Sequence, residues 1–256
     1  MLETVKLSWH VVRRNWWVYR KDFLANISPT LADPAFMMLS LGVGLGAFVA
    51  DVGGRSYMAF LAPGMAVSTA MFTSFFETSY GFYVRMTFEN IFKAMLTTPI
   101  GIREVVIGEF IWVALKSALM AACVTVVLLG FGLFENPWLL PLSPIIGIAI
   151  GLPLGAMGLL STCYVSNINQ FQTVYSFLIA PLYFMSGIFF PLDQMPAWAQ
   201  WLAAALPLHH GVRLAQSLFW DENLLQVWAI HLPILLVYSA GLLAWAYVQL
   251  RKKLQT

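Results

Sequence analysis

The sequence is 256 residues long, 60% hydrophobic and only 10% charged, with a formal net charge of +2 at pH 7. Since so few charged residues cannot cover the surface of a soluble domain of this size, a soluble globular fold is excluded and lipid is the expected solvent. Eleven of the fourteen Lys and Arg residues gather at residues 6–21, 85–103 and 251–253. Cytoplasmic segments of membrane proteins carry an excess of Lys and Arg, so these three segments are predicted to face the cytoplasm.

Residues 1–26 are predicted to form an amphipathic helix at the membrane surface, ahead of a membrane domain at residues 27–256. Basic residues interrupt this segment too often for a signal peptide, so we expect it on the mature protein. Its apolar residues recur at three- and four-residue steps, on one face of a helix: Val5, Trp9, Val12, Trp16, Tyr19 and Phe23. Aromatic and basic faces on opposite sides are typical of a helix lying among anionic headgroups. The alternative is a cytoplasmic helix packed on a partner.

Six membrane spans are predicted after this helix, because one crossing needs about 20 consecutive apolar residues. They are placed at residues 29–50, 57–83, 105–130, 142–165, 171–190 and 225–250. In this arrangement Arg55 and Arg213 lie on the side of the membrane opposite the cytoplasm, and Lys116 lies within a span. Both termini then lie in the cytoplasm.

Glycine spacing predicts a close helix contact in the fourth span. Gly147, Gly151 and Gly155 recur at four-residue intervals. This pattern lets helix backbones approach closely. Because such spacing is common in membrane helices, it indicates packing and not activity.

Residues 191–223 are predicted to form an outer, re-entrant or interfacial hairpin of two short helices. Pro196 and Pro207 interrupt the charge-free part of this segment, which argues against a seventh span. A seventh span would also place the C-terminal basic cluster outside. The aromatic residues expected as anchors at headgroup depth are Trp198, Trp201, Phe219 and Trp220.

Ionisable residues are expected inside two neighbouring spans: Glu77 in the second, and Glu109 and Lys116 in the third. Charged groups at membrane depth are costly and commonly mark a transport pathway, a proton relay or an internal ion pair. Glu109 and Lys116 lie two helical turns apart on one face, and Glu77 on the neighbouring helix is positioned to pair with Lys116. A purely structural ion pair between the helices is the alternative.

A polar turn is predicted where the fourth and fifth spans meet. Its amide residues include Asn169 and Gln170, and the polar character continues into Tyr175 and Tyr183. These side chains are candidates for the cytoplasmic mouth of a pathway. Equally, they are suited to capping the ends of the two helices.

The segment between the second and third spans is predicted to contain a cytoplasmic helix of about three turns. It starts near Met86, with Thr87 as its cap, and is stopped by Pro99. The apolar residues expected to share one face are Phe88, Ile91, Phe92 and Met95. An amphipathic helix between two spans predicts docking into a groove of a partner.

Motifs of common enzymes are absent from the sequence. It contains no G-x-x-x-x-G-K-[ST] phosphate loop, no H-E-x-x-H zinc helix and no G-x-S-x-G nucleophile turn. Cys123 and Cys163 are both expected within spans, as small apolar groups. His209 and His210 are adjacent, so on a helix they point about 100° apart and form a poor metal pair.

Several short motifs along essentially the whole chain carry a resemblance to a known family. They are Leu31-Ala32-Asp33-Pro34 leading into the Gly-rich part of the first span, Phe76-Glu77-Thr78, Gly108-Glu109, the run from Pro181 to Pro191, and Leu206-Pro207-Leu208-His209-His210. With them the chain resembles the permease subunits of type-2 ABC transporters. The S-G-x-x-F-P pattern at residues 186–191 is the most specific part. Within the family, the sequence is most similar to the nodulation-factor (lipo-oligosaccharide) exporter permeases.

The resemblance implies an all-α subunit of six transmembrane helices in the bacterial inner membrane. It implies a second copy of the permease, two copies of a separate cytoplasmic ATPase that binds ATP and Mg²⁺, and export of an amphipathic or lipid-linked substrate. Membrane lipids are further partners, whereas no nucleic acid and no cofactor in this chain are expected. The helix around residues 88–96 becomes the ATPase-coupling helix, with Phe88, Glu89, Ile91, Phe92, Lys93 and Met95 as its candidate residues.

A second class of function, transport without a separate ATPase, is the alternative. A self-contained secondary transporter or channel would use the intramembrane residues Glu77, Glu109 and Lys116. Secondary transporters are often built from internal repeats, and no convincing repeat relates the two halves of this sequence. The exporter subunit is therefore the favoured prediction.

Overall fold

The computed structural model of the chain describes residues 2–49 and 51–255, and the regular secondary structure of those residues is helical, apart from one isolated β-bridge between Val52 and Arg55. Three residues lie outside the described ones: Met1, Ala50 and Thr256. Met1 is the first residue of the predicted surface helix, Ala50 the last of the predicted first span, and Thr256 the last of the predicted membrane domain. The all-α class predicted from the sequence is confirmed for the part of the chain that the structure describes.

The helices differ widely in length. In chain order they are α1 (Leu2–Lys21), α2 (Phe23–Met37) with a π-helical extension (Met38–Leu45), α3 (Tyr57–Phe76) with a π-helical extension (Glu77–Gly81), α4 (Phe82–Thr87), α5 (Ile91–Leu96), α6 (Ile102–Leu129), a 3-10 turn (Pro137–Leu142), α7 (Ser143–Tyr164), α8 (Gln170–Val174), a π-helical segment (Tyr175–Ile179), α9 (Ala180–Phe184), a 3-10 turn (Leu192–Gln194), α10 (Ala197–Ala204), α11 (Pro207–Phe219) and α12 (Leu224–Gln255).

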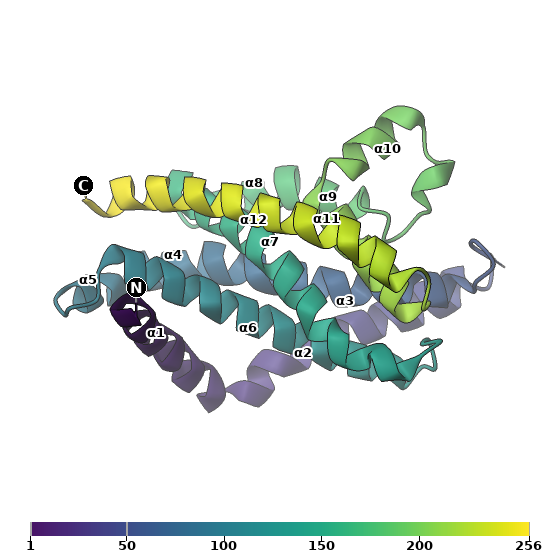
Figure 1. Ribbon diagram of the computed structural model, residues 1–256, viewed down its shortest axis with the longest axis horizontal. Helices are drawn as coiled ribbons and strands as arrows, with labels where there is room; N and C mark the ends of the chain where they lie inside the picture. The colour runs from purple at the N-terminus through teal and green to yellow at the C-terminus, as the bar shows by residue number, and fades with distance from the viewer. Residues whose placement is uncertain (1, 50, 256) are drawn as a thin grey trace.

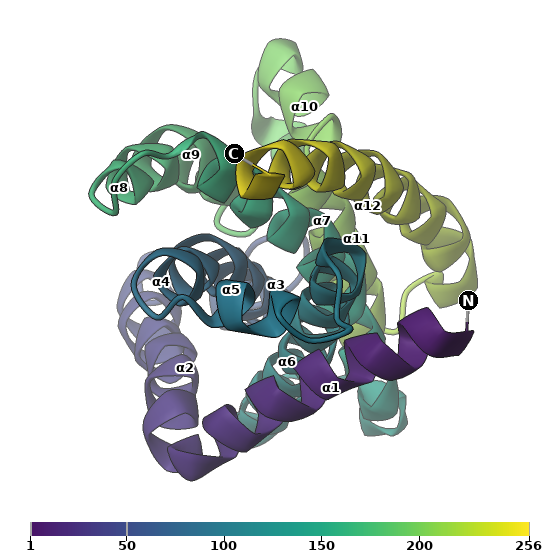
Figure 2. The same cartoon turned by 90° about the vertical axis from the view of Figure 1, so that its left-hand side faces the viewer.

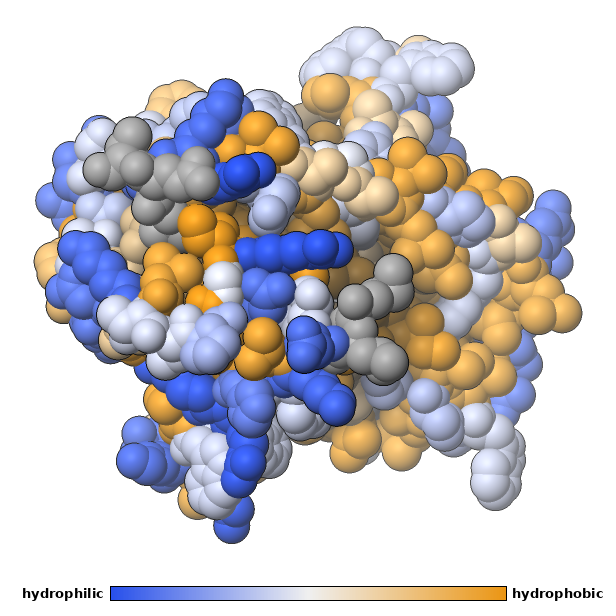
Figure 3. All heavy atoms as spheres, turned by 60° about the vertical axis from the view of Figure 1, so that its left-hand side comes forward, coloured by the Kyte–Doolittle hydropathy of each residue, from blue (hydrophilic) through white to orange (hydrophobic). Residues whose placement is uncertain are grey.

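The long helices run back and forth between two ends of an elongated bundle (Figure 1). One end, which we name the α5 end, carries α5, the turn at residues 165–169 and the C-terminal part of α12 (Figures 1 and 2). The opposite end, which we name the Arg55 end, carries the loops around Arg55, Glu135 and Glu222. Hydrophilic side chains gather at the α5 end, and hydrophobic ones dominate the flank behind it (Figure 3).

Four of the described helices are long and apolar enough to cross a membrane. They are Tyr57–Thr87, Ile102–Leu129, Pro137–Tyr164 and Leu224–Lys253. They correspond to the second, third, fourth and sixth predicted spans. At the first and fifth positions lie α2 with its π-helical extension and the shorter run from α8 to α9. A multi-pass membrane fold is therefore established, and the count of six stays a prediction.

The predicted glycine contact is confirmed between α6 and α7. A methyl group on Gly147 would lie 2.4 Å from the backbone oxygen of Ser117, and one on Gly151 would lie 2.6 Å from its Oγ atom. Because real Cβ atoms do not come so near, larger residues would force the helices apart. The α6–α7 pair thus forms a tightly packed centre for the sites described below.

A helix forms within residues 1–26 as predicted, but it ends at Lys21, and the orientation of its aromatic face toward lipid stays a prediction. Val12 and Tyr19 are buried, whereas Val5, Trp9 and Trp16 are 54%, 54% and 44% exposed. The buried residues Ser8, Val11 and Asn15 complete the inner face. Gly108 on α6 leaves space for Val11, so α1 packs on α6 with a rotation that the apolar spacing alone does not reveal.

The segment after α9 does form two short helices, α10 and α11, as predicted. Trp198 and Trp201 on α10 are 67% and 79% exposed, as interfacial anchors would be. The prediction that Phe219 and Trp220 are interfacial anchors is wrong. Phe219 is fully buried, with its ring centroid 4.0 Å from that of Phe134. The indole of Trp220 lies beneath Arg55. Helix α11 therefore belongs to the core of the bundle.

Candidate functional site

The predicted intramembrane charges meet in a buried ion-pair network near the α5 end. Glu77 begins the π-helical extension of α3, and its two carboxylate oxygens take separate cationic partners. Oε1 accepts from Arg85 Nη1 at 2.8 Å, and Oε2 accepts from Lys116 Nζ at 2.6 Å. The indole N–H of Trp112 donates to Oε1 at 3.2 Å. The predicted Glu77–Lys116 pair is thus confirmed.

Glu109, for which the sequence predicts no partner, binds side chains from two other helices. Its side chain is only 1% exposed, and Oε2 accepts from Arg85 Nη2 at 2.8 Å. Its second oxygen, Oε1, accepts from the amide of Asn15 on α1 at 3.0 Å. Arg85 therefore bridges two carboxylates, and with Lys116 it balances both negative charges, as buried charges require.

The network continues outward along α1. Arg14 Nη1 donates to Asn15 Oδ1 at 2.9 Å, and Arg14 Nη2 lies 3.9 Å from Glu89 Oε2. Glu89 belongs to the exposed segment between α4 and α5. One chain of polar contacts thus joins α1, α6, the end of α3 and the loop that leads into α5.

The π-helical turn at Glu77–Gly81 helps to place Arg85. A π-helical turn widens the backbone, and such turns are frequent at functional sites. Arg85 reaches back over this turn, and its Nη2 also donates to the backbone oxygen of Glu77 at 3.3 Å. Arg85 is predicted to lie in the segment between the second and third spans, and the structure corrects this. It lies within the helical run and is only 14% exposed.

Arg85, Asn15 and Trp112 were missed by the sequence reasoning. One signal was available: the predicted second and third spans contain two acidic residues and only one lysine. Since unbalanced charge is costly at membrane depth, that excess pointed to a further cation. Arg85 follows the apolar run at the end of the second span and is the nearest candidate.

Glu77 and Lys116 also line a groove of about 830 Å³ beside α2, α3, the π-helical segment Tyr175–Ile179 and α9. We name it the Tyr175 groove. Aromatic rings form much of one wall: Phe76 lies 5.9 Å from Tyr175, and Phe72 lies 5.1 Å from Tyr183. Hydroxyl groups line it as well, those of Thr30, Ser40, Ser68, Thr69 and Thr73. The groove therefore combines apolar rings, hydroxyls and an ion pair.

The other predicted pathway residues do not line this groove. Glu109 is enclosed behind Arg85. The backbone amides of Asn169 and Gln170 donate to the side-chain oxygen of Asn167, and Gln170 Oε1 accepts from the backbone amide of Ser166 at 2.8 Å. The side chain of Gln170 thus holds the turn, whereas the side chain of Asn169, immediately before α8, makes no capping hydrogen bond.

The predicted coupling helix is shorter than expected. Helix α4 ends at Thr87, and α5 contains only the six residues Ile91–Leu96. Asn90, immediately before α5, adopts a left-handed conformation with φ of +52°. This residue turns the chain, so the single helix of three turns starting near Met86 is wrong.

The turn at Asn90 also separates the residues expected to share a face. Phe92 is 1% exposed and its ring lies 4.4 Å from that of Phe82, inside the bundle. Phe88 is 63% exposed and points away from that core. Ile91 and Met95 are partly buried, while Glu89, Lys93 and Leu96 are exposed. Of the predicted coupling residues, Phe88, Glu89 and Lys93 are therefore exposed at the α5 end, together with the neighbouring Leu96.

His209 and His210 form a cluster with a third histidine, His231. Nδ1 of His210 on α11 lies 2.7 Å from Nδ1 of His231 on α12, and the ring of His209 lies 5.5 Å from that of His210. Among the described residues, no group of three or more His, Cys, Asp or Glu side chains has an arrangement suited to a metal ion. Cys123 and Cys163 are both free thiols.

Comparisons with known proteins agree with the architecture. A model of the family "ABC-2 type transporter" matches residues 6–220. The chain is 36% identical to Nodulation protein J of Rhizobium leguminosarum bv. viciae, over 91% of this chain and 89% of that protein. It is 33% identical to Nodulation protein J of Rhizobium meliloti (strain 1021), over 96% and 94%. It is 21% identical to the inner membrane transport permease YadH of Escherichia coli (strain K12), over 95% and 96%.

Proposed function

We propose, from the premise that this chain belongs to the ABC-2 type transporter family, that it is the membrane subunit of an ATP-driven exporter. The resemblance to this family and to its nodulation-protein branch, predicted from sequence motifs, is confirmed. The chain is accordingly a multi-pass membrane permease of an ABC transporter. The orientation, partners and substrate proposed below go beyond that assignment.

We propose that the α5 end faces the cytoplasm of a bacterium and that the chain crosses the inner membrane six times. The basic clusters at residues 6–21, 85–103 and 251–253 belong to segments that meet at the α5 end (Figure 1). At the opposite end, Arg55 is paired with Glu135 and Glu222. This asymmetry of Lys and Arg supports cytoplasmic termini.

A separate ATPase, present in two copies and holding ATP and Mg²⁺, is proposed to dock at the α5 end. A second copy of the permease completes the complex. The observation that carries this proposal is the position of Arg85, which binds Glu77 in the wall of the Tyr175 groove and lies one helical turn before the exposed Phe88. A displacement of α5 by the ATPase would therefore act on Arg85 and, through it, on the groove.

The Tyr175 groove is the proposed path of an amphipathic or lipid-linked substrate, such as a lipo-oligosaccharide, a polysaccharide-linked lipid or a drug-like molecule. Its aromatic rings offer apolar contact, and its hydroxyls and the Glu77–Lys116 pair offer polar contact. Binding sites for small molecules commonly combine an apolar lining with a few placed polar groups. The mixed lining thus supports a substrate with both characters.

The test compares two exposed leucines near opposite ends of the bundle. Leu96→Asp places a charge in the proposed docking surface, which should reduce co-purification of the ATPase about tenfold or more, because an unpaired charge in an apolar contact is costly. Leu225→Asp, at the start of α12, is the matched control and should retain the ATPase. Leu96 is 37% and Leu225 86% exposed, so neither change disturbs the core.

Transport and ATP hydrolysis complete this experiment. The purified chain alone should not hydrolyse ATP, because it lacks a phosphate-binding loop. With the ATPase added, the Leu96→Asp variant should lose substrate-stimulated hydrolysis. Normal ATPase recruitment by Leu96→Asp would contradict docking at α5. Transport by the chain alone in proteoliposomes would instead favour the self-contained transporter that uses Glu77 and Lys116.

A further inference from the structure

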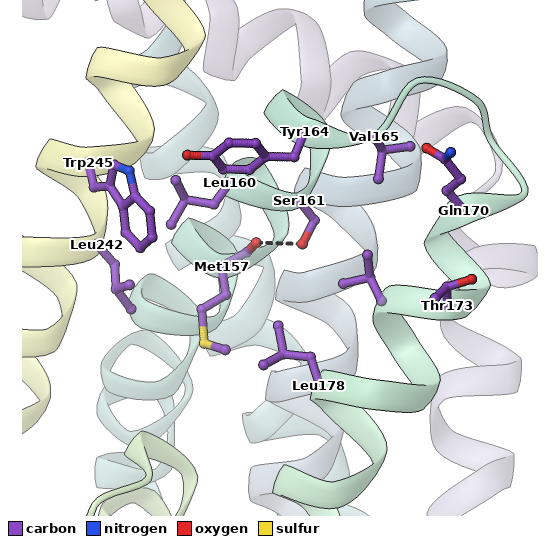
Figure 4. A pocket seen from close by; sticks show the side chains of 11 residues that line it. Met157, Leu160, Ser161, Tyr164, Val165, Gln170, Thr173, Leu178, Leu242 and Trp245 are labelled. Atoms are coloured by element: carbon purple, nitrogen blue, oxygen red, sulfur yellow. Dashed lines mark hydrogen bonds between the residues drawn. The ribbon is translucent and has the colours of Figure 1, made fainter.

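A second cavity lies on the other side of the fifth helical run, between α7, the run from α8 through residue 178, and α12 (Figure 4). We name it the Trp245 cleft. Its volume is about 700 Å³, within the range of about 300–1,000 Å³ typical of ligand sites. Its walls are mainly apolar and include Met157, Leu160, Leu178 and Leu242. None of the residues that line it belongs to the ion-pair network.

Two polar side chains in the walls of the Trp245 cleft are hydrogen-bonded within the protein, and most of the wall is apolar. Ser161 Oγ donates to the backbone oxygen of Met157 at 2.8 Å, as Figure 4 shows. Gln170 Oε1 accepts from the backbone amide of Ser166 at 2.8 Å. The cleft consequently offers hydrocarbon contact, and a ligand that fits it is apolar in this part.

Two aromatic side chains flank the cleft near the α5 end. Tyr164 from α7 and Trp245 from α12 extend toward each other across it (Figure 4) and are 61% and 51% exposed. Tyr and Trp concentrate at membrane–water interfaces, where one end of the ring is apolar and the other is wet. Their position therefore marks the headgroup level at this end of the cleft.

Basic residues lie beyond these rings. Lys252 follows Trp245 by seven residues on the continuous helix α12, which places it on the same face, roughly 10 Å further along the axis. Lys253 Nζ donates to the backbone oxygens of Thr162 and Val165 at 2.7 and 3.0 Å. This contact holds the basic end of α12 over the turn that borders the cleft. No Asp or Glu is among the residues that line the cleft.

We propose that the Trp245 cleft binds one acyl chain of an anionic phospholipid, with the phosphate group beside Lys252. The lipid belongs to the leaflet nearest the α5 end. Along the cleft, the apolar walls come first, then the aromatic pair at headgroup depth, and then the positive charge. An anionic phospholipid has its parts in the same order, from the acyl chain to the phosphate group. A second copy of the chain fits less well, because in one membrane it has the same orientation. Its own basic cluster would then face Lys252 at the same depth.

The experiment measures lipid retention by the purified full-length protein. Native mass spectrometry in the presence of equal amounts of phosphatidylglycerol and phosphatidylcholine should show one phosphatidylglycerol bound preferentially. Thr173→Trp fills the cleft and should abolish this bound lipid. Ser176→Trp, an exposed position on the same helical run outside the cleft, is the matched control and should retain it. Lys252→Gln should lower the preference for phosphatidylglycerol about fivefold.

A fluorescence measurement tests the site without a bulky substitution. Acyl chains that carry bromine quench nearby tryptophans, and the emission lost in Trp245→Phe defines the contribution of Trp245. Brominated phosphatidylglycerol should quench this contribution more than brominated phosphatidylcholine does. Equal quenching by both lipids, or lipid retention by Thr173→Trp at the wild-type level, would overturn the proposal. Conversion of a dimer to a monomer by Thr173→Trp without loss of lipid would also overturn it and assign the cleft to a second copy.

Discussion

The two ends of this molecule use the same arrangement of charges in opposite surroundings. Near the α5 end, Arg85 bridges Glu77 and Glu109, whose side chains are 11% and 1% exposed. At the other end, Arg55 bridges Glu135 and Glu222, whose side chains are 54% and 53% exposed. Each arginine uses its guanidinium to hold two carboxylates from separate segments. The surroundings, and not the pairing, therefore decide what each cluster contributes.

Burial makes the first cluster costly to disturb. Removing one member of a buried ion pair leaves an uncompensated charge away from water, which costs about 3–5 kcal/mol. Exposed pairs are screened by water and salt, and each contributes about 0–1 kcal/mol. The comparison thus predicts a rigid junction near the α5 end and an adjustable contact between loops at the Arg55 end.

The largest effect is expected for Arg85→Gln. Glu77 would keep Lys116, but Glu109 would lose the one cation that it pairs with among the described residues, while remaining buried. The expected loss of about 3–5 kcal/mol corresponds to a drop of about 10 °C in the thermal unfolding midpoint in detergent. Arg103→Gln, an exposed change at the same end, is the control and should leave the midpoint unchanged. An unchanged midpoint for Arg85→Gln would show that the network is not a structural junction.

A smaller effect is expected for the coupling between Glu77 and Lys116. Thermal or denaturant unfolding of Glu77→Gln, Lys116→Gln and the double variant forms a double-mutant cycle. Groups in direct contact show interaction energies of about 0.5–3 kcal/mol, so the double variant should be more stable than the sum of the single changes implies. Additive changes would mean that the 2.6 Å contact contributes no net stability. The same cycle with Arg55 and Glu135 should give a lower value.

Much of the fold could be predicted from the sequence because it depends on local patterns. Hydrophobic length alone locates the four long helices, and helix geometry brings Glu77 near Lys116. These inferences use residues within one helix or on two adjacent ones. They fail where contacts from a third element decide the outcome.

Arg85 and Phe92 show why the remainder could not be predicted. Counting positive charges assigned Arg85 to a loop, since a count cannot show that its guanidinium reaches back to two carboxylates. Helical periodicity placed Phe92 beside Phe88, since a periodic pattern assumes an unbroken helix. The left-handed Asn90 breaks that assumption. Likewise, the rotation of α1 depends on the space that Gly108 leaves on α6.

The smallest effect is expected for Arg55→Gln. The substitution removes two exposed ion pairs and the contact of the guanidinium carbon with the Trp220 ring, 4.5 Å from its centroid. An exposed cation–π contact contributes about 0.5–1 kcal/mol, so the total loss should stay near or below about 2 kcal/mol. The loss should also shrink as NaCl rises from about 0.1 M to about 1 M, because the screening length falls from about 10 Å to about 3 Å. Arg85→Gln should keep its full effect at both concentrations, since salt does not enter the buried network. Thermal midpoints of both variants at both salt concentrations make this comparison directly, and equal salt dependence would remove the distinction between the two ends.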